Sequence, residues 1–414
     1  MKITIVGGGI GGCVAALLLN EAGHDVEVYE SVVTPTELGV GINVLPHAVR
    51  VLDDLGLLPE LDRAAVRTSE LRLLSLNGVT IWREARGLAA ENPWPQYSIH
   101  RGHFHRILLG AVIDRLGADR VHTGHRALSV DGTGDDASTS SVTFLDRKGD
   151  EHVVVEADIT VACDGIHSAI RSQLYPAQGH PHPSGLVLWR GAVLAEPFLD
   201  GSTMFMAGDD DQKAVVYPVT PPDSGGRQLI NWVAERPMDV DMRTVSWNRE
   251  VDVAMVAALF EKWALGFIHV GELISSTDTA YEFPMVDRTP VDRWSFGRVT
   301  LLGDAAHAMR PNGSNGSSQA ILDGEALAGA LRRIDDPTEA LVAYELERLE
   351  PTTRLTLANR QSGPERVMQW VADRCDGSCV DQHVCVDASE LEREATAYKE
   401  LAGFDIARLR AMSN

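Results

Sequence analysis

A glycine-rich hexapeptide near the N-terminus constrains the fold of this chain more than any other feature. It contains the pattern G-x-G-x-x-G, formed by Gly7, Gly9 and Gly12. A β-branched run over residues 2–6 precedes it, helically spaced apolar residues follow, and residues 24–30 have the composition of a second strand. A strand, a tight turn, a helix and a strand in this order predict a βαβ unit, and therefore a parallel sheet.

The glycines have distinct expected roles in binding a dinucleotide. Gly7 permits the tight turn, Gly9 lets the backbone approach a pyrophosphate, and Gly12 allows close packing of the helix on the strand. The helix N-terminus, which includes Gly11, directs its N–H groups and positive dipole end at the phosphates. Glu30, at the end of the second strand, is placed to accept hydrogen bonds from both ribose hydroxyls. Because a carboxylate there disfavours a 2′-phosphate, the pattern indicates FAD or NAD rather than NADP, with a ligand-free glycine turn as the alternative.

Two later segments each place an aspartate just after a predicted strand. Asp164 follows an apolar run over residues 156–163, and Asp304 follows Gly303 after the run 299–302. Ligands of parallel α/β sheets bind at this carboxyl-terminal edge of the strands. Each aspartate also precedes a helix-like segment, so a helix N-cap is the alternative for both, and capping is compatible with ligand binding.

Taken together, these motifs resemble those of the para-hydroxybenzoate hydroxylase-type flavoproteins, the group A FAD-dependent aromatic monooxygenases. The resemblance spans residues 1 to about 360, and within the family the chain is most similar to the phenazine and salicylate-type hydroxylases. Beside the motifs above, the similarity is carried by residues 38–43, 97–102, 189–191, 284–288 and 313–316. Chance does not account for all of these segments in this order.

The resemblance implies a role for each matched cofactor residue. Asp304 would bind the ribityl chain of FAD, with Gly303 allowing close approach, and Arg101 would contact the ribityl or pyrophosphate group. Asp164 belongs, with Arg171, to a motif that contacts the FAD pyrophosphate and NAD(P)H. The remaining matched residues would lie along the isoalloxazine ring: Gly39, Val40 and Gly41 beside it, and Pro311, Gly313, Asn315 and Gly316 toward its pyrimidine end. A helix N-terminus near N1 would stabilise the negative charge of the reduced ring.

The same resemblance implies a reaction. NADH or NADPH would reduce FAD, O2 would add at flavin C4a, and the hydroperoxide would hydroxylate a small aromatic substrate. Carboxylated or polycyclic compounds of secondary metabolism are the expected substrate class. An epoxidase or oxidative decarboxylase of the same fold, a non-oxygenating flavoprotein oxidoreductase and a non-catalytic FAD-binding protein are the alternatives. The sequence has no C-x-x-C pair, which argues against a dithiol flavoprotein.

We expect an α/β fold in which a Rossmann-like FAD-binding parallel sheet carries an inserted, mostly antiparallel substrate-binding sheet and a helical C-terminal tail. The expected divisions are residues 1–183 and 291–360 for the FAD-binding domain, 184–290 for the insertion and 361–414 for the tail.

The substrate pocket is expected between the inserted sheet and the flavin. Its candidate wall residues are Trp189, Met204, Tyr217, Trp232 and Pro284, each with ordinary sheet core as the alternative. No catalytic residue is assigned, although Tyr217 and His100 are candidates for a base. Arg310 is a candidate partner for an acidic substrate, with a surface carboxylate as the alternative.

The composition excludes some classes of partner. The formal net charge of -22 disfavours binding to nucleic acid and to anionic membranes. No apolar stretch reaches the ~18 residues of a membrane span. We therefore expect a cytoplasmic protein, either a monomer or a homodimer, that binds only small molecules.

Four potential metal ligands near the C-terminus form a C-x3-C-x3-H-x-C pattern, made of Cys375, Cys379, His383 and Cys385. The ligand types suit zinc, but the spacing matches none of the common zinc motifs. We therefore predict no metal site and interpret these cysteines as free surface thiols.

Overall fold

A six-stranded, mostly parallel sheet carries the glycine motif in the computed structural model, which describes residues 1–34, 40–238, 249–375 and 386–413. The strand order is β19-β20-β12-β1-β2-β8, and all neighbours pair in parallel except β19 with β20. The strands are β1 (Lys2–Val6), β2 (Asp25–Glu30), β8 (Val121–Thr123), β12 (Ile159–Ala162), β19 (Ser295–Phe296) and β20 (Val299–Leu301). The predicted βαβ unit is therefore present.

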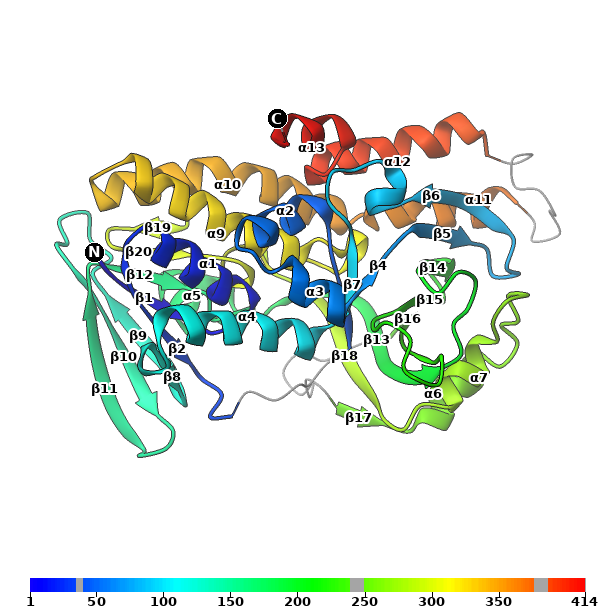
Figure 1. Cartoon of the computed structure of the whole chain (residues 1–414), viewed down its shortest axis with the longest axis horizontal. Coiled ribbons are helices and arrows are strands. Elements are labelled where there is room, and N and C mark those ends of the chain that lie inside the picture. Colours follow the sequence, from blue (N-terminus) through cyan, green and yellow to red (C-terminus); the bar gives the residue numbers. More distant parts are fainter. Residues whose placement is uncertain (35–39, 239–248, 376–385, 414) are drawn as a thin grey trace.

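Helix α1 (Ile10–Glu21) connects β1 to β2 and is enclosed on several sides. It packs against α9 (Gly316–Arg333) and α4 (Arg101–Leu116), and α10 (Pro337–Asn359) covers α9 (Figure 1). Residues 12–19 are all buried, as expected for a helix that is apolar around its circumference. The first turn of α1 is thereby held at the carboxyl-terminal edge of the sheet.

The second large sheet has eight strands in the order β17-β18-β13-β16-β15-β14-β5-β6, all antiparallel except for the pair β14 and β5. It lies on the right in Figure 1. The strands are β5 (Glu70–Leu74), β6 (Thr80–Ala85), β13 (His182–Ala195), β14 (Thr203–Gly208), β15 (Lys213–Pro218), β16 (Gln228–Pro237), β17 (Arg249–Val251) and β18 (Ala280–Asp287). This sheet thus takes strands from two separate parts of the chain.

Side chains of the eight-stranded sheet alternate between two faces, each covered by different helices. One face, which includes Trp189 and Trp232, forms a hydrophobic cluster with α6 (Val253–Leu259) and α7 (Val270–Ser275). The opposite face, which includes Met204 and Tyr217, forms a cluster with α11 (Arg366–Arg374) and α12 (Ala388–Ala402). Both faces of the sheet are therefore buried.

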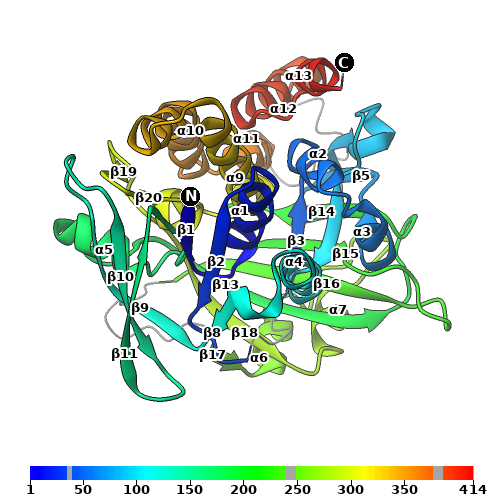
Figure 2. The same ribbon diagram turned by 60° about the vertical axis from the view of Figure 1, so that its left-hand side comes forward.

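Two three-stranded antiparallel sheets and several short helices complete the described part of the chain. β9 (His125–Asp131), β10 (Ser140–Asp146) and β11 (Glu151–Ala157) form the sheet at the left edge of Figure 1, and β3 (Gly41–Val44), β7 (Tyr97–His100) and β4 (Val66–Arg67) form the other. The remaining helices are α2 (Pro46–Asp54), α3 (Leu58–Ala64), α5 (Ala169–Leu174), α8 (Asp304–His307) and α13 (Ile406–Met412). Figure 2 shows α10, α12 and α13 along the same side of the molecule.

The predicted fold class is confirmed, with two local differences. The apolar run 156–163 is divided between the antiparallel strand β11 and the parallel strand β12. The sequence pattern of residues 249–265 predicts a single helix, but the structure has strand β17 followed by the shorter α6. Asp252 caps that helix by accepting a hydrogen bond from the N–H of Ala254 at 2.9 Å.

Some sequence predictions fall outside the described residues: Gly39, Cys379, His383 and Cys385. Cys375 is disulfide-bonded, so the prediction of a free thiol at this position is wrong. Among the described residues, no group of three or more His, Cys, Asp or Glu side chains is arranged to hold a metal ion. In the same part of the chain, no helix is both long and apolar enough to cross a bilayer.

Candidate functional site

A cavity of about 330 Å³ lies between the glycine motif and the Tyr217 face of the eight-stranded sheet. Small-molecule sites typically have volumes of roughly 300–1,000 Å³. Its wall is built from the start of α1, strand β3, the turn after β20, the segment 309–317, and strands β13 and β15. The sequence-predicted residues that line it are Gly9, Gly11, Gly41, Arg101, Tyr217, Gly303, Asp304, Arg310, Pro311 and Gly316.

The glycines of the motif divide into two structural groups. Gly7 has φ +104°, and a Cβ there would overlap the carbonyl oxygen of Cys163. A Cβ on Gly12 would overlap the carbonyl oxygen of Gly7. In contrast, a Cβ on Gly9 would meet no atom within 4 Å, because Gly9 faces the cavity. Gly7 and Gly12 are therefore required by packing, whereas Gly9 leaves room for a ligand.

The N-terminus of α1 is open to the cavity. Gly9 is its N-cap, so no side chain caps the helix, and its first turn has no acidic residue. Gly9, Ile10 and Gly11 all line the cavity. An uncapped helix N-terminus presents N–H groups and a positive partial charge, which suits a phosphate.

Glu30 supports the glycine loop from the end of β2. Its Oε2 accepts a hydrogen bond from the N–H of Gly8 at 2.8 Å, and its Oε1 accepts one from the N–H of Val32 at 2.7 Å. The side chain is only half-buried. Oε1 also accepts a hydrogen bond from the hydroxyl of Ser31 at 3.1 Å. Oε2 retains a second acceptor position, so the arrangement leaves capacity for a ribose hydroxyl.

Asp164 contacts the start of helix α5 (Ala169–Leu174) but is not its N-cap, which is Ser168, so the N-cap alternative for Asp164 is wrong. Its Oδ2 accepts a hydrogen bond from the N–H of Ala169 at 2.8 Å at the start of α5. Its Oδ1 is buried and has no hydrogen-bond partner among the described residues, and burial raises the pKa of this carboxyl group. Arg171 is buried and donates to the carbonyl oxygens of Ala305 and Ala306, at 2.7 and 2.5 Å. The buried Arg171 therefore ties α5 to α8 and does not line the cavity.

The Gly303–Asp304 turn directs a carboxylate into the cavity. Gly303 adopts φ +62°, which glycine tolerates without strain. The side chain of Asp304 is accessible from the cavity but is otherwise enclosed by protein, and no described residue hydrogen-bonds to it. Burial raises the pKa of Asp304, against the opposing charges of His307 and Arg101.

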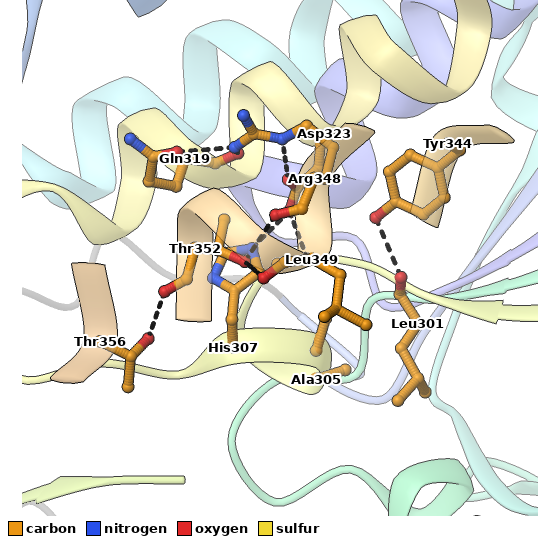
Figure 3. Close-up of polar contacts among 12 residues, drawn as sticks. Leu301, Ala305, His307, Gln319, Asp323, Tyr344, Arg348, Leu349, Thr352 and Thr356 are labelled. Carbon is orange, nitrogen blue, oxygen red and sulfur yellow. Dashed lines mark hydrogen bonds and ion pairs between the residues drawn. The ribbon is translucent and has the colours of Figure 1, made fainter. Parts of the chain in front are cut away.

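A buried charge network holds this turn in place (Figure 3). Asp323 of α9 accepts a hydrogen bond from the N–H of Gly303 at 3.1 Å, and its Oδ2 lies 2.5 Å from Nε2 of His307. Nε of Arg348, from α10, donates to Oδ1 of Asp323 at 2.8 Å. Burial opposes the charge on Asp323, but His307 and Arg348 outweigh it and lower the pKa of this carboxyl group to about 2. Sequence reasoning missed Asp323 and Arg348. The available signal for a buried ion pair was Asp323 itself, an acidic residue on the apolar face of α9.

The loop 311–316 has two sides with different neighbours. Pro311, Ser314 and Gly316 line the cavity. Asn315 is fully buried on the other side, where its Nδ2 donates to the carbonyl oxygen of Gly313 and to the hydroxyl of Tyr398, both at 3.0 Å. Helix α9 begins at Gly316 without a side-chain cap or an acidic first turn. A second open helix N-terminus therefore borders the cavity.

The opposite wall is polar and comes from the eight-stranded sheet and β3. Arg190 of β13 and Tyr217 of β15 both line it. The N–H of Gly41 donates to Oδ1 of Asn231 at 2.6 Å, which fastens β3 to the sheet. The carbonyl oxygen of the buried Val40 accepts a hydrogen bond from the N–H of Arg101 at 3.0 Å, so Val40 positions Arg101 without lining the cavity.

Three of the predicted wall residues lie on the other face of the sheet. Nε1 of Trp189 donates to Glu282 at 3.0 Å, and Nε1 of Trp232 donates to Thr277 at 2.8 Å, both in the cluster with α6 and α7. Pro284 pairs with Val187, whose side chain belongs to that same cluster. Neighbouring residues of a strand point to opposite faces, so Arg190 reaches the cavity where Trp189 does not.

Of the two remaining candidates, Met204 does not line the main cavity, whereas Arg310 lines it and also pairs with a carboxylate. Met204 borders a separate small apolar cavity beside Gly313. Nε of Arg310 donates to Asp287 at 3.1 Å, so this arginine pairs with a fully buried carboxylate and not with a surface one, while it also lines the main cavity.

The residues around the cavity fit a bound dinucleotide. Two open helix N-termini and the cation of Arg101 suit its anionic groups, and the unpartnered carboxylate of Asp304 suits hydroxyl donors. A flavin dinucleotide needs acceptors along a polyhydroxy chain, which Asp304 supplies at the centre of the site.

Comparisons with known proteins lead to the same cofactor. The family model described as FAD binding domain matches residues 1–357. Phenazine 1,6-dicarboxylic acid hydroxylase PhzS of Lysobacter antibioticus is 44% identical over 365 residues, covering 86% of this chain and 89% of that protein. The 6-hydroxynicotinate 3-monooxygenase of Bordetella bronchiseptica is 30% identical over 363 residues, with 86% and 89% covered.

Solved structures share the fold. CtdE in complex with FAD and a substrate has a TM-score of 0.76 at 19% identity, with 100% of both chains covered. Klebsiella pneumoniae HpxO complexed with FAD and uric acid has a TM-score of 0.73 at 24% identity, with 100% of this chain and 95% of that chain covered. Together with the family match, which confirms the resemblance in the motifs, these findings show that the chain belongs to the FAD binding domain family and is an FAD-dependent aromatic hydroxylase.

Proposed function

We propose that this enzyme hydroxylates a carboxylated polycyclic aromatic compound of the phenazine acid class, with NADH or NADPH as the electron donor. The observation that carries the proposal is the guanidinium of Arg190 in the cavity wall. Similarity to a hydroxylase of phenazine 1,6-dicarboxylic acid supports the same class. An anionic substrate needs a cation in its pocket, and Arg190 supplies one.

Arg190 and Tyr217 share one face of the eight-stranded sheet. The register pairs Arg190 with Val233 and Tyr217 with Asn231. Since residues two apart on a strand point to the same side, the two side chains project together into the cavity. They would form one donor group for the substrate.

The guanidinium of Arg190 has no hydrogen bond to any described residue. Its Nε is buried without a partner, and its Cζ lies 5.8 Å from the ring centroid of Phe283. Burial lowers the pKa of Arg190, but arginine begins so high that the group stays cationic at neutral pH. A half-buried cation without a paired anion is costly, and a substrate carboxylate would offset that cost through a bidentate pair.

We propose the FAD contacts on the other side of the cavity. The N-terminus of α1, with Gly9 and Gly11, would receive the pyrophosphate, and Glu30 the ribose. Asp304 would accept from the ribityl hydroxyls, while Arg101 adds positive charge. The N-terminus of α9 at Gly316 would face the pyrimidine edge of the flavin. Bound FAD supplies the chemistry that passes electrons from NAD(P)H to O2.

The predicted residues that do not line the cavity would support these contacts without touching FAD. Asp164 and Val40 hold the segments that carry Gly165 and Arg101, and the buried side chain of Asn315 shapes the loop that presents Ser314. The protein's own part in the reaction would be to fix the acid end of the substrate at Arg190 and to keep its ring between the sheet and the loop.

The test compares phenazine, phenazine-1-carboxylic acid and phenazine-1,6-dicarboxylic acid as probes. We expect the acids to stimulate NAD(P)H consumption and to gain one oxygen atom by mass spectrometry, and phenazine itself to do neither. Arg190→Gln should raise the KM for the acids by about tenfold or more, the value of one charge-assisted hydrogen bond pair, with FAD affinity unchanged. Arg249→Gln, an exposed arginine that pairs with Glu282, is the control. Equal stimulation by neutral and acidic probes, or an unchanged KM in Arg190→Gln, would overturn the proposal.

A further inference from the structure

Two residues contact the loop 311–316 on the side away from the cavity. Both lie beyond the region matched by the family model, which ends at residue 357. The two residues are Glu365, next to helix α11, and Tyr398 of α12, both in the C-terminal segment that the sequence presents only as a charged helical tail. Both side chains are buried, at 6% exposure each. A buried polar side chain is expected to have a structural or functional partner, and here the partner is the loop.

Tyr398 contacts Asn312, Gly313 and Asn315 of the loop, and also Asn359 at the end of α10. Its hydroxyl lies 3.0 Å from Nδ2 of Asn315, 3.2 Å from the carbonyl oxygen of Asn312 and 2.9 Å from Oδ1 of Asn359. The ring also packs on Gly313, where a Cβ would overlap the hydroxyl. The hydroxyl accepts from Asn315 and donates to one of the two oxygens, so its hydrogen-bonding capacity is used almost fully by the loop and its neighbour.

Glu365 contacts the same loop from another side. Its Oε2 accepts from Nδ2 of Asn312 at 3.0 Å, and its Oε1 accepts from the N–H of Gly313 at 3.3 Å. It also forms an ion pair with Lys213 of β15, and Lys213 pairs with Glu235 at 2.8 Å. Burial opposes the charge on Lys213, but the two carboxylates outweigh it and raise its pKa. Glu365 therefore joins the loop to the strand that carries Tyr217.

The loop needs such support because its backbone is strained. Gly313 has φ +68° and Ser314 has φ +57°. A non-glycine residue in the left-handed region costs of the order of 1 kcal/mol and persists only where its surroundings enforce it. Ser314 is also a residue that faces the cavity.

We propose that Tyr398 and Glu365 form a clamp that positions the loop 311–316 against the flavin of the bound cofactor. The proposal rests on the proposed contact between this loop and the flavin. The clamp holds the left-handed Gly313–Ser314 backbone, which is strained at Ser314, so that Pro311 and Ser314 face the cavity and α9 begins at its edge. Both residues act through the loop and are positioning residues.

The test uses Tyr398→Phe and Glu365→Gln in the full chain. The matched control is Tyr175→Phe, which removes the hydrogen bond from Tyr175 to the carbonyl oxygen of Arg293 at a site that does not line the cavity. The first readout is amide hydrogen exchange of residues 311–317 in the protein stripped of FAD. The second and third are the Kd for FAD and the reduction potential of the bound flavin.

We expect faster exchange in the loop, an FAD affinity about tenfold weaker and a more negative flavin potential in both clamp variants, since the removed contacts are charge-assisted or buried hydrogen bonds. The control should match the wild type in all three readouts. Unchanged loop exchange and an unchanged potential in both clamp variants would overturn the proposal. If Tyr398→Phe does not fold, Glu365→Gln alone decides, because it keeps the shape of the side chain. No readout requires a substrate, so failure to find a phenazine substrate leaves this test intact.

Discussion

The backbone N–H of Gly41 donates a 2.6 Å hydrogen bond to Oδ1 of Asn231, although 190 positions separate the two residues in the sequence. Gly41 belongs to β3, and Asn231 belongs to the central part of the eight-stranded sheet. The bond therefore fastens β3 to the sheet within one wall of the cavity, at the point where Gly41 lines it.

Replacement of Gly41 by alanine should disrupt this junction. An added Cβ would lie 2.6 Å from Cε2 of Tyr217 and 2.7 Å from Cγ1 of Val219, which leaves no room for it. We expect Gly41→Ala to reduce the free energy of unfolding by about 1–3 kcal/mol and to weaken FAD binding. Gly110→Ala is the control, because a Cβ in this helical position meets no atom within 4 Å and should be neutral or stabilising by about 0.5–1 kcal/mol. Equal urea midpoints for the two variants would contradict the role of Gly41.

Alanine substitutions in the glycine motif should separate its role in folding from its role in cofactor binding. Gly12→Ala should prevent correct folding, because its Cβ would overlap the carbonyl oxygen of Gly7. Gly9→Ala should unfold within about 0.5 kcal/mol of the wild type but bind FAD at least tenfold more weakly, since its methyl group would project into the cavity. Urea denaturation and FAD titration measure the two effects. An alanine at position 9 that leaves FAD affinity unchanged would show that the pyrophosphate lies elsewhere.

The buried carboxylate of Asp323 should contribute far more to the free energy of unfolding than an exposed carboxylate does. Asp323→Asn leaves Arg348 and His307 without their shared partner, and we expect a loss of about 3–5 kcal/mol in the free energy of unfolding. Asp54→Asn, which breaks an exposed pair with Arg50, should cost less than about 1 kcal/mol. Urea denaturation of both variants at neutral pH provides the measurement. Losses of similar size would mean that the network in Figure 3 does not stabilise the Gly303 turn.

His47 should make the protein less stable in acid. It is 1% exposed, and neither ring nitrogen has a hydrogen bond to any residue that the structure describes. Burial, followed by nearby arginines, lowers its pKa from 6.5 to about 3. The unfolded chain therefore takes up the proton first, and stability is full above pH 6.5 and is lost as the pH falls toward 3. We expect this residue to cost about 2 kcal/mol at pH 5 relative to pH 7.5.

The comparison of wild type with His47→Gln isolates this contribution, because glutamine does not titrate and all other groups are common to both proteins. The free energy of unfolding should fall by about 2 kcal/mol less in the variant between the two pH values. The same pH dependence in both proteins would mean that His47 binds its proton equally well in the folded and unfolded chains, so that folding does not lower its pKa.

The local chemistry of the cofactor side could be predicted from the sequence. The glycine motif and the Gly303–Asp304 turn are short, contiguous patterns, and each follows a strand and opens a helix, so neighbours in the chain determine their geometry. The structure places Gly9, Gly303 and Asp304 around one cavity, as expected.

The substrate side could not be predicted in the same way. Alternation along β13 and β16 was visible, but both faces of the sheet are buried, so hydrophobicity does not distinguish Trp189 from Arg190 as the cavity residue. The contact of Tyr398 with Asn315 joins a helix to a loop 83 positions away, and that of Arg348 with Asp323 joins two helices across 25 positions. Such contacts depend on how the helices pack and leave no periodic signal in the sequence.

The most direct test of the central claim is a turnover experiment under ¹⁸O2 with the purified protein, FAD, NAD(P)H and phenazine-1,6-dicarboxylic acid. An FAD-dependent aromatic hydroxylase should return a hydroxylated product that carries one ¹⁸O atom, formed only when both FAD and NAD(P)H are present. Consumption of NAD(P)H with hydrogen peroxide as the sole oxygen product, for this and every other aromatic acid supplied, would contradict it.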